Sequence, residues 1–382
     1  MAVIAIFCDG TWNTFDGPNR THVARLAEAC VKDDAQKVIY IEGVGTGTGT
    51  VSQIGRTLSK LGGGVFGWGL NRNIKLAYLE LCRCYRPGDK IMVFGFSRGA
   101  YTARSLVGMI RKCGILRDPN ARNLRRAFRL YRTRGWRGMP DSHAVWEKRR
   151  RLSPNFATSA EDVIRRADHS FLVRITYLGV WDTVGALGIP KGVLGPLASV
   201  WNARYAFHDT RLTRLVEEAR HAVALDEKRV LFEPSLWSNL DVDGDDPGLN
   251  RGDRTAERRY QQVWFAGNHS VVGGASAPQA LANASLEWIW QAAKTSGLRL
   301  KTRDYLPVVP VDAAAPAPDI YDVNKAYAAV PWLLRWRHGP ERSENLHPTA
   351  RLRAALLPGY RPRTLKPVMA GLFAKKESAL RL

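Results

Sequence analysis

The sequence predicts an α/β fold of the doubly wound class, in which helices cover both faces of a mostly parallel sheet. Several apolar runs are continuous rather than alternating, which is typical of parallel strands buried on both faces. Segments with apolar residues at helical spacing separate these runs, and strands that alternate with helices favour βαβ units. One run leads through a Gly-x-Ser-x-Gly pentapeptide directly into a helical pattern.

The predicted elements alternate between strand and helix along most of the chain. The apolar runs predict strands at residues 2–8, 38–42, 90–96, 171–181 and 262–266. The helical patterns lie at about residues 20–30, 66–86, 98–113 and 278–294. Ligands of such sheets bind outside the carboxyl ends of the strands. We therefore expect functional side chains in the turns that follow the apolar runs.

A chain of 382 residues is long enough to bury a sizeable core. We predict a main domain over residues 1–300 and a C-terminal extension over 301–382, where prolines and an alanine run change the composition. Two interpretations of the extension stay open: it packs on the domain, or its last residues lie on a membrane surface. A basic helical insertion or cap at 117–168 interrupts the main domain.

The positive charge is the outlier of the composition. The chain has 57 Lys and Arg against 35 Asp and Glu, a net charge of +22. This surplus attracts an anionic partner, whether phospholipid head groups, nucleic acid or an acidic protein. In the insertion, Leu124, Phe128 and Tyr131 recur at helical spacing, so one face of a helix can dock on the core. The arginines on the other face have two interpretations: a solvated surface, or a surface that approaches anionic lipid. The basic residues there are Arg122, Arg125, Arg126, Arg129, Arg132, Arg134, Arg137, Lys148, Arg149, Arg150 and Arg151.

Cysteine usage and the N-terminal sequence favour a protein made in the cytoplasm. The five cysteines are odd in number and lie mostly in apolar runs, which suits buried free thiols in a reducing compartment. The N-terminus lacks the basic start and long apolar stretch of a signal peptide. No apolar run approaches the roughly 20 residues needed to cross a bilayer. Export by a dedicated secretion machine stays open.

The pentapeptide GFSRG places Ser97 between Gly95 and Gly99 at the end of a predicted strand. In a nucleophile elbow the chain turns so sharply from strand to helix that the serine adopts strained backbone angles and exposes its hydroxyl. Only very small neighbours permit this turn. The bare motif also occurs by chance. Its position between a strand and a helix makes Ser97 a candidate nucleophile.

A serine hydroxyl is a weak nucleophile, so it needs a base within hydrogen-bond reach and an acid that orients the base. In proteins with this elbow the partners follow in the order serine, acid, histidine. Asp182 directly follows the run at 171–181, and His269 follows the run at 262–266. Both strand ends lie on the same rim of the sheet as Ser97. We therefore predict a catalytic triad of Ser97, Asp182 and His269.

Other residues remain weaker candidates for the acid and the base. Asp226 is the second choice for the acid. His208, beside Asp209, and His221, shortly before Asp226, compete weakly with His269 for the role of base. His269 is preferred because a predicted strand delivers it to the rim.

Acyl transfer also needs donors for the developing oxyanion. One is the backbone N–H of Arg98, the residue after the nucleophile. For the second we nominate the backbone of Gly10 or Thr11, in the turn that closes the first strand; without a catalytic role, this run is an ordinary capped turn. The glycine-rich stretch 43–49 lacks both the GxxxxGK and the GxGxxG pattern, so we expect a rim loop there and no nucleotide site.

A set of motifs, in order along the chain, resembles one known family. They are CDGTWN at 8–13, YIEGVGTG at 40–47, GFSRGAYTAR at 95–104, GVWDTVGA at 179–186, HAVALDEKR at 221–229 and WFAGNHSVVGG at 264–274. Over about residues 1–295 the chain is similar to the alpha/beta-hydrolase family of type VI secretion phospholipase effectors, also described as domain of unknown function 2235. The resemblance implies an alpha/beta-hydrolase-like catalytic domain, cleavage of phospholipid acyl esters, and the same triad of Ser97, Asp182 and His269.

One position departs from the family pattern. Where relatives commonly read HSDVGG, this chain has Val271 in place of the carboxylate. If that carboxylate supports the histidine loop in relatives, its loss lowers activity here. Every member of the predicted triad is nevertheless present.

The leading hypothesis is a serine esterase or lipase that cleaves phospholipids and needs no metal or organic cofactor. The resemblance implies a phospholipid or membrane surface as the substrate. It also implies two partners of a type VI effector, a secretion apparatus and an immunity protein. Nucleic acid is not expected as a partner. A first alternative is a weakened hydrolase-fold protein whose charge binds anionic membranes or nucleic acid. A second is a soluble esterase for small substrates. The sequence leaves the acyl position, the head group and the oligomeric state open.

Overall fold

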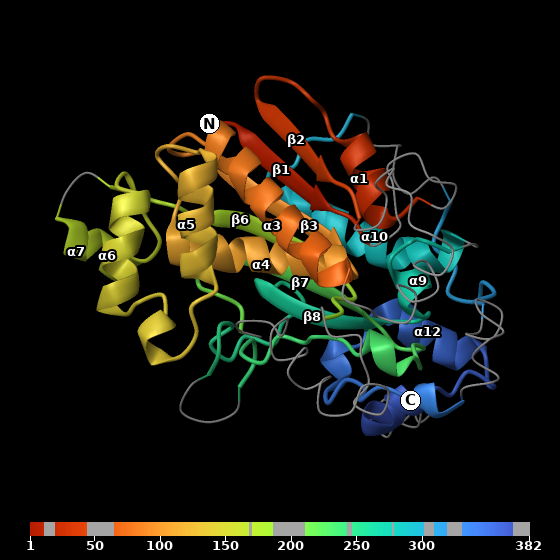
Figure 1. Ribbon diagram of the computed structural model, residues 1–382. Helices are drawn as coiled ribbons and strands as arrows, with labels where there is room; N and C mark the ends of the chain where they lie inside the picture. The colour runs from red at the N-terminus through yellow and green to blue at the C-terminus, as the bar shows by residue number, and fades with distance from the viewer. Residues whose placement is uncertain are drawn as a thin grey trace.

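The computed structural model describes residues 1–10, 20–43, 65–167, 170–185, 211–242, 247–276, 279–301, 309–318 and 331–369. Its centre is a six-stranded sheet of order β2-β1-β3-β6-β7-β8, in which every neighbouring pair is parallel (Figure 1). The strands are β1 (Val3–Cys8), β2 (Gln36–Ile41), β3 (Lys90–Phe96), β6 (Ile175–Trp181), β7 (Val216–Ala224) and β8 (Tyr260–Phe265). Because β2 and β3 lie on opposite sides of β1, the strand order reverses there, at the position where open α/β sheets bind ligands.

Helices cover both faces of this sheet, so the doubly wound prediction is confirmed. One face carries α3 (Val65–Cys84) and α4 (Arg98–Cys113), and the other carries α1 (His22–Ala29) and α10 (Gln279–Thr295) (Figure 1). Alternate residues of β1 enter the two cores. Ile4 and Ile6 pack with α3 and α4, whereas Val3, Ala5 and Phe7 pack with α1 and α10.

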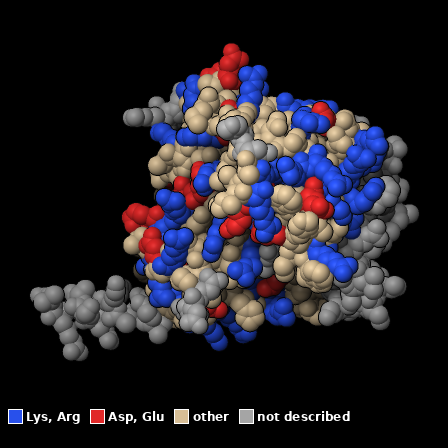
Figure 2. Space-filling model, turned by 90° about the vertical axis from the view of Figure 1, so that its left-hand side faces the viewer, with Lys and Arg blue, Asp and Glu red and all other residues tan. Residues whose placement is uncertain are grey.

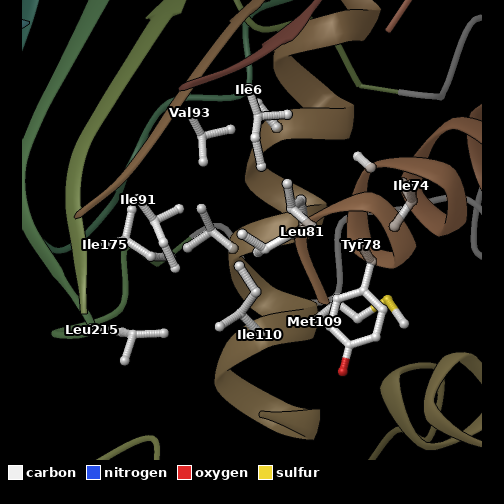
Figure 3. Packing of buried hydrophobic residues seen from close by; sticks show 14 of the residues in the cluster. Ile6, Ile74, Tyr78, Leu81, Ile91, Val93, Met109, Ile110, Ile175 and Leu215 are labelled. Carbon is white, nitrogen blue, oxygen red and sulfur yellow. The ribbon is translucent and has the colours of Figure 1, made fainter. Parts of the chain in front are cut away.

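The core under α3 and α4 is a continuous apolar layer (Figure 3). Ile91 and Val93 of β3 and Ile175 of β6 lie on the sheet side of this layer. Leu81 of α3 and Ile110 of α4 face them from the helices, and all of these side chains are fully buried. Burial on both faces explains why β1 and β3 have uninterrupted apolar sequences. The packing fixes the strand ends from which the site residues project.

The observed strands differ from the predicted ones at two places. The run at 171–181 forms two strands: β5 (Phe171–Leu172) pairs with β4 (Phe156–Ala157) in a separate two-stranded sheet, and only β6 joins the central sheet. Strand β7 was not expected from the sequence. Its first half contains Glu217, Glu218 and Arg220, which are partly exposed. These charges interrupt the apolar pattern that identifies the other central strands.

The basic insertion is helical, and its apolar face docks on α4 as expected. Its elements are α5 (Ala121–Tyr131), η1 (Trp136–Gly138), α6 (His143–Leu152) and α7 (Ala160–Arg166). On α5, Ala127, Leu130 and Tyr131 are buried. The exposed arginines of the same helix are Arg122, Arg125, Arg126 and Arg129. Figure 2 shows the side of the molecule that carries the insertion, where Lys and Arg cover much of the surface with acidic residues between them.

Two arginines of the insertion point inward: Arg149, which was expected on the basic surface, and Arg166. Arg149 Nε donates to Asp162 Oδ2 at 2.9 Å, and Arg166 Nε donates to Asp162 Oδ1 at 2.8 Å. The backbone N–H of Thr158 also donates to this carboxylate at 2.9 Å. All three charged side chains are buried, and buried charges persist only when they are paired. Part of the basic charge of the insertion is therefore structural.

The described part of the C-terminal region packs on the β8 edge of the sheet (Figure 1). Its elements are η5 (Pro331–Leu333), η6 (Ser343–Asn345), α12 (Pro348–Leu356) and η7 (Arg363–Val368). Leu346, Ala350 and Leu365 share a buried cluster with Trp264 of β8 and with Val271. The end of the chain, which includes the predicted membrane-surface segment, lies outside the described residues from residue 370 onward.

Two sequence-based expectations concern the cysteines and the membrane. Cys8, Cys30, Cys82 and Cys113 are buried free thiols, and Cys84 is a partly buried one, as expected. Among the described residues, no helix combines the length and the apolar composition that a bilayer span requires.

Candidate active site

The turn between β3 and α4 has the geometry of a nucleophile elbow. Ser97 adopts φ 57° and ψ −122°, a strained conformation for a residue with a side chain. A Cβ on Gly95 would lie 2.6 Å from the carbonyl oxygen of Gly99. A Cβ on Gly99 would lie 2.1 Å from the carbonyl oxygen of Cys8. Both glycines are therefore required by close backbone contact. Ser97 itself is only 6% exposed, so its hydroxyl is more enclosed than the elbow motif predicts.

Sheet register brings Ser97 next to Asp182. Phe96 of β3 pairs with Trp181 of β6, and each of the two site residues follows one member of this pair. The Ser97 N–H donates to the Trp181 carbonyl at 3.0 Å. Asp182 N–H donates to the Ala222 carbonyl of β7 at 2.7 Å. Asp182 also has a positive φ, 37°, so strained backbone occurs at both positions.

His269 begins the short helix α9 (His269–Val272), just beyond the end of β8. The Asn268 side chain caps this helix by accepting hydrogen bonds from the N–H groups of Ser270 and Val271. The rings of Phe96 and Phe232 flank the imidazole, each with its centroid 4.7 Å away. The cap and the two rings hold the imidazole in one orientation.

The three residues form one hydrogen-bonded line. His269 Nε2 lies 2.8 Å from Ser97 Oγ, and His269 Nδ1 lies 2.5 Å from Asp182 Oδ2. When Nδ1 carries the proton and donates to the carboxylate, Nε2 is free to accept the serine proton. The arrangement can thus generate a nucleophile from the serine hydroxyl.

Burial and charge set the protonation of this line. Burial raises the pKa of Asp182, but Arg337 and the hydrogen bond from His269 outweigh it and hold that pKa well below its usual value. Burial lowers the pKa of His269, and Asp182 opposes that effect only in part. The resting pair is therefore an aspartate anion beside a neutral imidazole.

Arg337, which was not expected in the site, binds the same aspartate from the C-terminal region. Its two terminal nitrogens lie 2.8 Å from Asp182 Oδ1 and Oδ2, one on each oxygen. It also donates to the carbonyl oxygens of Ala224 and Phe232. Arg337 and Asp182 are separated by 155 positions, and the run Trp336-Arg337-His338 follows no apolar strand. Nothing in the local sequence marks this arginine as part of a site.

A second buried ion pair supports the histidine loop. Arg229 Nε and Nη2 donate to Glu227 at 2.8 and 2.7 Å, and Glu227 Oε2 accepts from the His269 N–H at 3.2 Å. Glu227 is fully buried. Neither residue of this pair was expected in the site. Its only local signal was the acidic run that contains Asp226.

The alternative acid and base occupy other positions. In the described part of the chain, the Asp226 carboxylate accepts hydrogen bonds from the Gly267 N–H at 2.7 Å and the Tyr360 hydroxyl at 2.8 Å. His221 Nε2 accepts from the Thr183 N–H at 3.1 Å, while Nδ1 pairs with Gln262 Oε1 at 3.0 Å. Burial, with Arg104 nearby, lowers the pKa of His221 to about 3, so this ring is neutral.

His208 lies outside the described residues.

The carboxyl end of β1 lies directly against the elbow, because Gly99 packs on the backbone of Cys8 and Asp9. The Gly10 N–H donates to Asp9 Oδ1 at 2.6 Å, and the hydroxyls of Thr21 and Tyr40 donate to the same carboxylate. Burial raises the pKa of Asp9 to about 6.

Thr11 and Arg98 are the other two nominated oxyanion donors. Thr11 falls outside the described residues. Arg98 is the first residue of α4, so its N–H belongs to the amino end of that helix, where the helix dipole favours negative charge.

Val271 points into an apolar cluster. Its side chain is 1% exposed and packs with Trp264, Leu346 and Ala350. A Cβ on Gly267 would lie 2.5 Å from Val271 Cγ1, so the side chain also packs against the turn that precedes His269. At this position the chain supports the histidine loop through apolar contact.

A cavity of about 870 Å³ opens beside the middle of α4. Arg104, Arg111 and Tyr131 are among its lining residues. Ser97, Asp182 and His269 are not, so this cavity is separate from the hydrogen-bonded line.

The parallel sheet, with helices on both faces and a strained serine turn after β3, defines a doubly wound α/β protein. Residues 3–292 match the family model described as "T6SS, Phospholipase effector Tle1-like, catalytic domain", where T6SS denotes the type VI secretion system. The chain belongs to this family of Tle1-like phospholipase effectors. The family expected from the sequence motifs is thus confirmed.

Individual relatives are longer than this chain. An uncharacterized protein of Saccharomyces cerevisiae is 30% identical over 244 residues, which cover 62% of this chain and 33% of the relative. The crystal structure of an uncharacterized protein from Pseudomonas aeruginosa matches with 16% identity and a TM-score of 0.40, over 86% of this chain and 53% of that one. The Tle1 effector bound to the VgrG spike of the type VI secretion system matches with 17% identity and a TM-score of 0.36, over 72% and 51%. The chain therefore spans about a third of the yeast relative and about half of each solved structure.

Proposed function

We propose that this protein is a serine hydrolase that cleaves carboxylic ester bonds of phospholipids, with Ser97, His269 and Asp182 as its catalytic triad. The observation that carries the proposal is the hydrogen-bonded line from Ser97 Oγ through both imidazole nitrogens to Asp182 Oδ2, at 2.8 and 2.5 Å. Membership of a phospholipase effector family supports phospholipids as the substrate class.

In the proposed mechanism, His269 Nε2 takes the proton of Ser97 as Oγ attacks the ester carbonyl carbon. The Arg98 N–H and a second donor from the loop at Gly10 or Thr11 stabilise the oxyanion. Collapse of the tetrahedral intermediate expels the alcohol, which receives the proton from His269. Water, activated by the same nitrogen, then hydrolyses the acyl-enzyme, and Asp182 keeps the proton on Nδ1 throughout.

In the part of the loop that the structure describes, the Gly10 N–H is already engaged by Asp9. If Gly10 is the second donor, substrate must displace that hydrogen bond. If Thr11 is the donor, the bond between Gly10 and Asp9 serves to fix the loop. A Thr11→Pro variant, which lacks the N–H, tests the second form: an unchanged kcat would exclude Thr11 as the donor.

A covalent probe tests the nucleophile. A fluorophosphonate should label the wild-type protein and fail to label Ser97→Ala. Ser105→Ala is the matched control, because Ser105 is another buried serine about two turns further along α4. This variant should label like the wild type. An unlabelled wild type would contradict the proposed mechanism.

A second candidate function is binding of anionic membranes without turnover. The exposed arginines Arg122, Arg125, Arg126 and Arg129 on α5 favour it. In that case wild type and Ser97→Ala would bind phosphatidylserine vesicles equally and salt-sensitively, and neither would release fatty acid. Fatty acid released by the wild type alone would favour the hydrolase.

We further propose that the protein is a type VI effector, delivered by the secretion apparatus and matched by an immunity protein in the producing cell. The family name supports this role. Production of the protein in the periplasm of a host cell tests it. The wild type should arrest growth and Ser97→Ala should not, whereas equal growth with both would contradict a toxic hydrolase.

A further inference from the structure

We propose that Arg337, from the C-terminal region, is a positioning residue of the active site: it clamps the Asp182 carboxylate in the orientation that His269 needs and offsets its charge. The inference rests on the proposed triad. Arg337 lies 45 positions beyond residue 292, where the family match ends (337 − 292). The clamp is thus an addition to the part of the chain that the family model covers.

The geometry around Asp182 leaves the carboxylate one orientation. Oδ1 accepts from Arg337 at 2.8 Å and from the Ala224 N–H at 2.9 Å. Oδ2 accepts from Arg337 at 2.8 Å and from His269 Nδ1 at 2.5 Å. A bidentate guanidinium fixes the plane of a carboxylate, which a lysine ammonium cannot do. Rotation of Asp182 would break the bonds to Arg337 and His269 together.

The fold delivers Arg337 through anchors on both sides. The Arg335 N–H donates to the Lys228 carbonyl at 2.6 Å, and Leu334 forms a β-bridge with Arg229. On the far side, Leu346 forms a β-bridge with Trp264 of β8. These contacts anchor the segment to the turn after β7 on one side and to β8 on the other.

Charge balance gives the clamp a measurable effect on His269. Glu233 acts on Arg337 from its other side of the charge network. Four charged groups bear on the imidazole: Asp182 and Glu227, both anionic, Arg229, cationic, and Arg337, cationic, which acts on it through the ion pair with Asp182. These four charges cancel, and His221 beside Asp182 is neutral. Without Arg337 the cluster would carry a net negative charge, which favours the imidazolium. Arg337 therefore helps to keep His269 in the neutral form that accepts a proton.

The test compares Arg337→Met, Arg337→Lys and a control variant, Arg353→Met. Arg353 is also buried in the C-terminal region, but it donates to the carbonyl oxygens of Ala313 and Ala315 and not to the triad. Histidine side chains labelled with ¹⁵N report the His269 pKa by NMR, whether or not the protein turns over a substrate.

We expect the His269 pKa to rise by about one unit or more in Arg337→Met. Arg337→Lys should hold it near the wild-type value, because the charge is kept. In both variants kcat per fluorophosphonate-labelled site should fall about 10- to 100-fold with little change in KM, since the carboxylate loses its fixed plane. Arg353→Met should lower thermal stability and leave the His269 pKa and kcat unchanged.

The outcomes separate this inference from the proposed function. An unchanged His269 pKa in Arg337→Met, in a protein that hydrolyses phospholipid, would overturn the clamp and leave the triad standing. A raised pKa in a protein without hydrolase activity would support the clamp and count against the triad. If Arg337→Met fails to fold, a full wild-type kcat in Arg337→Lys would overturn the clamp.

Discussion

The backbone of Gly99 lies directly on the carbonyl oxygen of Cys8, so close that a Cβ on Gly99 would be 2.1 Å from that oxygen. This contact joins the start of α4 to the end of β1. It brings the elbow that carries Ser97 against the loop that carries Gly10. The backbone geometry at Ser97 therefore requires glycine at position 99.

Gly99→Ala should nearly abolish hydrolysis, because the added methyl group must push the elbow away from β1. Gly108→Ala is the matched control on the same helix: its Cβ would meet only a ring carbon of Tyr131, at an ordinary 3.5 Å. This control should keep full activity and gain up to about 1 kcal/mol of helix stability. Rates and melting temperatures of both variants check the prediction. Wild-type activity in Gly99→Ala would show that the elbow tolerates displacement.

Substitution of the two candidate acids should have very different effects. Asp182→Asn should lower kcat about 10⁴-fold, because the amide no longer holds the proton on His269 Nδ1. Asp226→Asn should stay within about tenfold of wild type, since Asp226 binds Gly267 and Tyr360. Steady-state rates normalised to fluorophosphonate-labelled sites provide the comparison. A larger loss of kcat in Asp226→Asn than in Asp182→Asn would identify Asp226 as the triad acid.

The lowered pKa of His269 predicts activity that persists into mildly acidic solution. A general base must be neutral, and a base with a lowered pKa stays neutral at lower pH. The acid limb of kcat/KM should therefore have its midpoint below the usual histidine value of about 6.5. The pH dependence of hydrolysis of a soluble ester measures this midpoint. A midpoint above that value would mean that Asp182 outweighs burial.

The buried Asp162 should be a major stabilising residue of the basic insertion. Asp162→Asn leaves Arg149 and Arg166 without their carboxylate and should cost about 3 to 5 kcal/mol. Arg122→Gln, on the exposed face of α5, should stay within about 0.5 kcal/mol of wild type. Urea unfolding of the two variants at neutral pH measures both effects. Equal stabilities would show that the buried ion pairs contribute nothing net.

The same residue predicts a pH dependence. Although burial raises the pKa of Asp162, its bonds to Arg166 and Arg149 outweigh burial and hold that pKa below the ordinary value. A carboxylate with a depressed pKa stabilises the fold fully above its unfolded pKa of about 3.9 and loses this effect as the pH falls through its folded value. The stability gap between wild type and Asp162→Asn should therefore shrink in acid. A gap that stays constant below that range would argue against an ionised Asp162.

The exposed arginines of α5 should contribute to membrane binding. Changing Arg122, Arg125, Arg126 and Arg129 to Gln should weaken binding to phosphatidylserine vesicles by about 1 kcal/mol per charge at low salt. The control set consists of four exposed basic residues outside α5, changed to Gln so that the same number of charges is removed: Arg83, Arg86, Arg363 and Lys366. Vesicle sedimentation compares the two sets. Equal losses would assign the binding to net charge alone.

The placement of the three candidate triad residues could be predicted because each follows a recognisable strand. The apolar runs of β3, β6 and β8 mark where Ser97, Asp182 and His269 leave the sheet. Parallel strands end on one rim, so sequence order alone places these residues together. The sequence did not reveal β7, because Glu217 and Glu218 at its start break the apolar run.

Arg337 could not be predicted for a different reason. Its role depends on an ion pair across 155 positions, and a basic residue in an irregular segment has no period that points to its partner. Arg149 shows the same limit in the insertion, where its neighbours Arg150 and Arg151 are exposed and it alone of the three is buried. Local sequence predicted the positive charge of these segments. Tertiary contacts determine which of these arginines are buried.

The most direct measurement of the central claim is the mass analysis of products after incubation with mixed phospholipid vesicles. Wild-type protein should release free fatty acid and the matching lysophospholipid, and Ser97→Ala under the same conditions should release neither. Absence of both products with the wild type, or their release by Ser97→Ala at the wild-type rate, would contradict the assignment of this chain as a serine phospholipase.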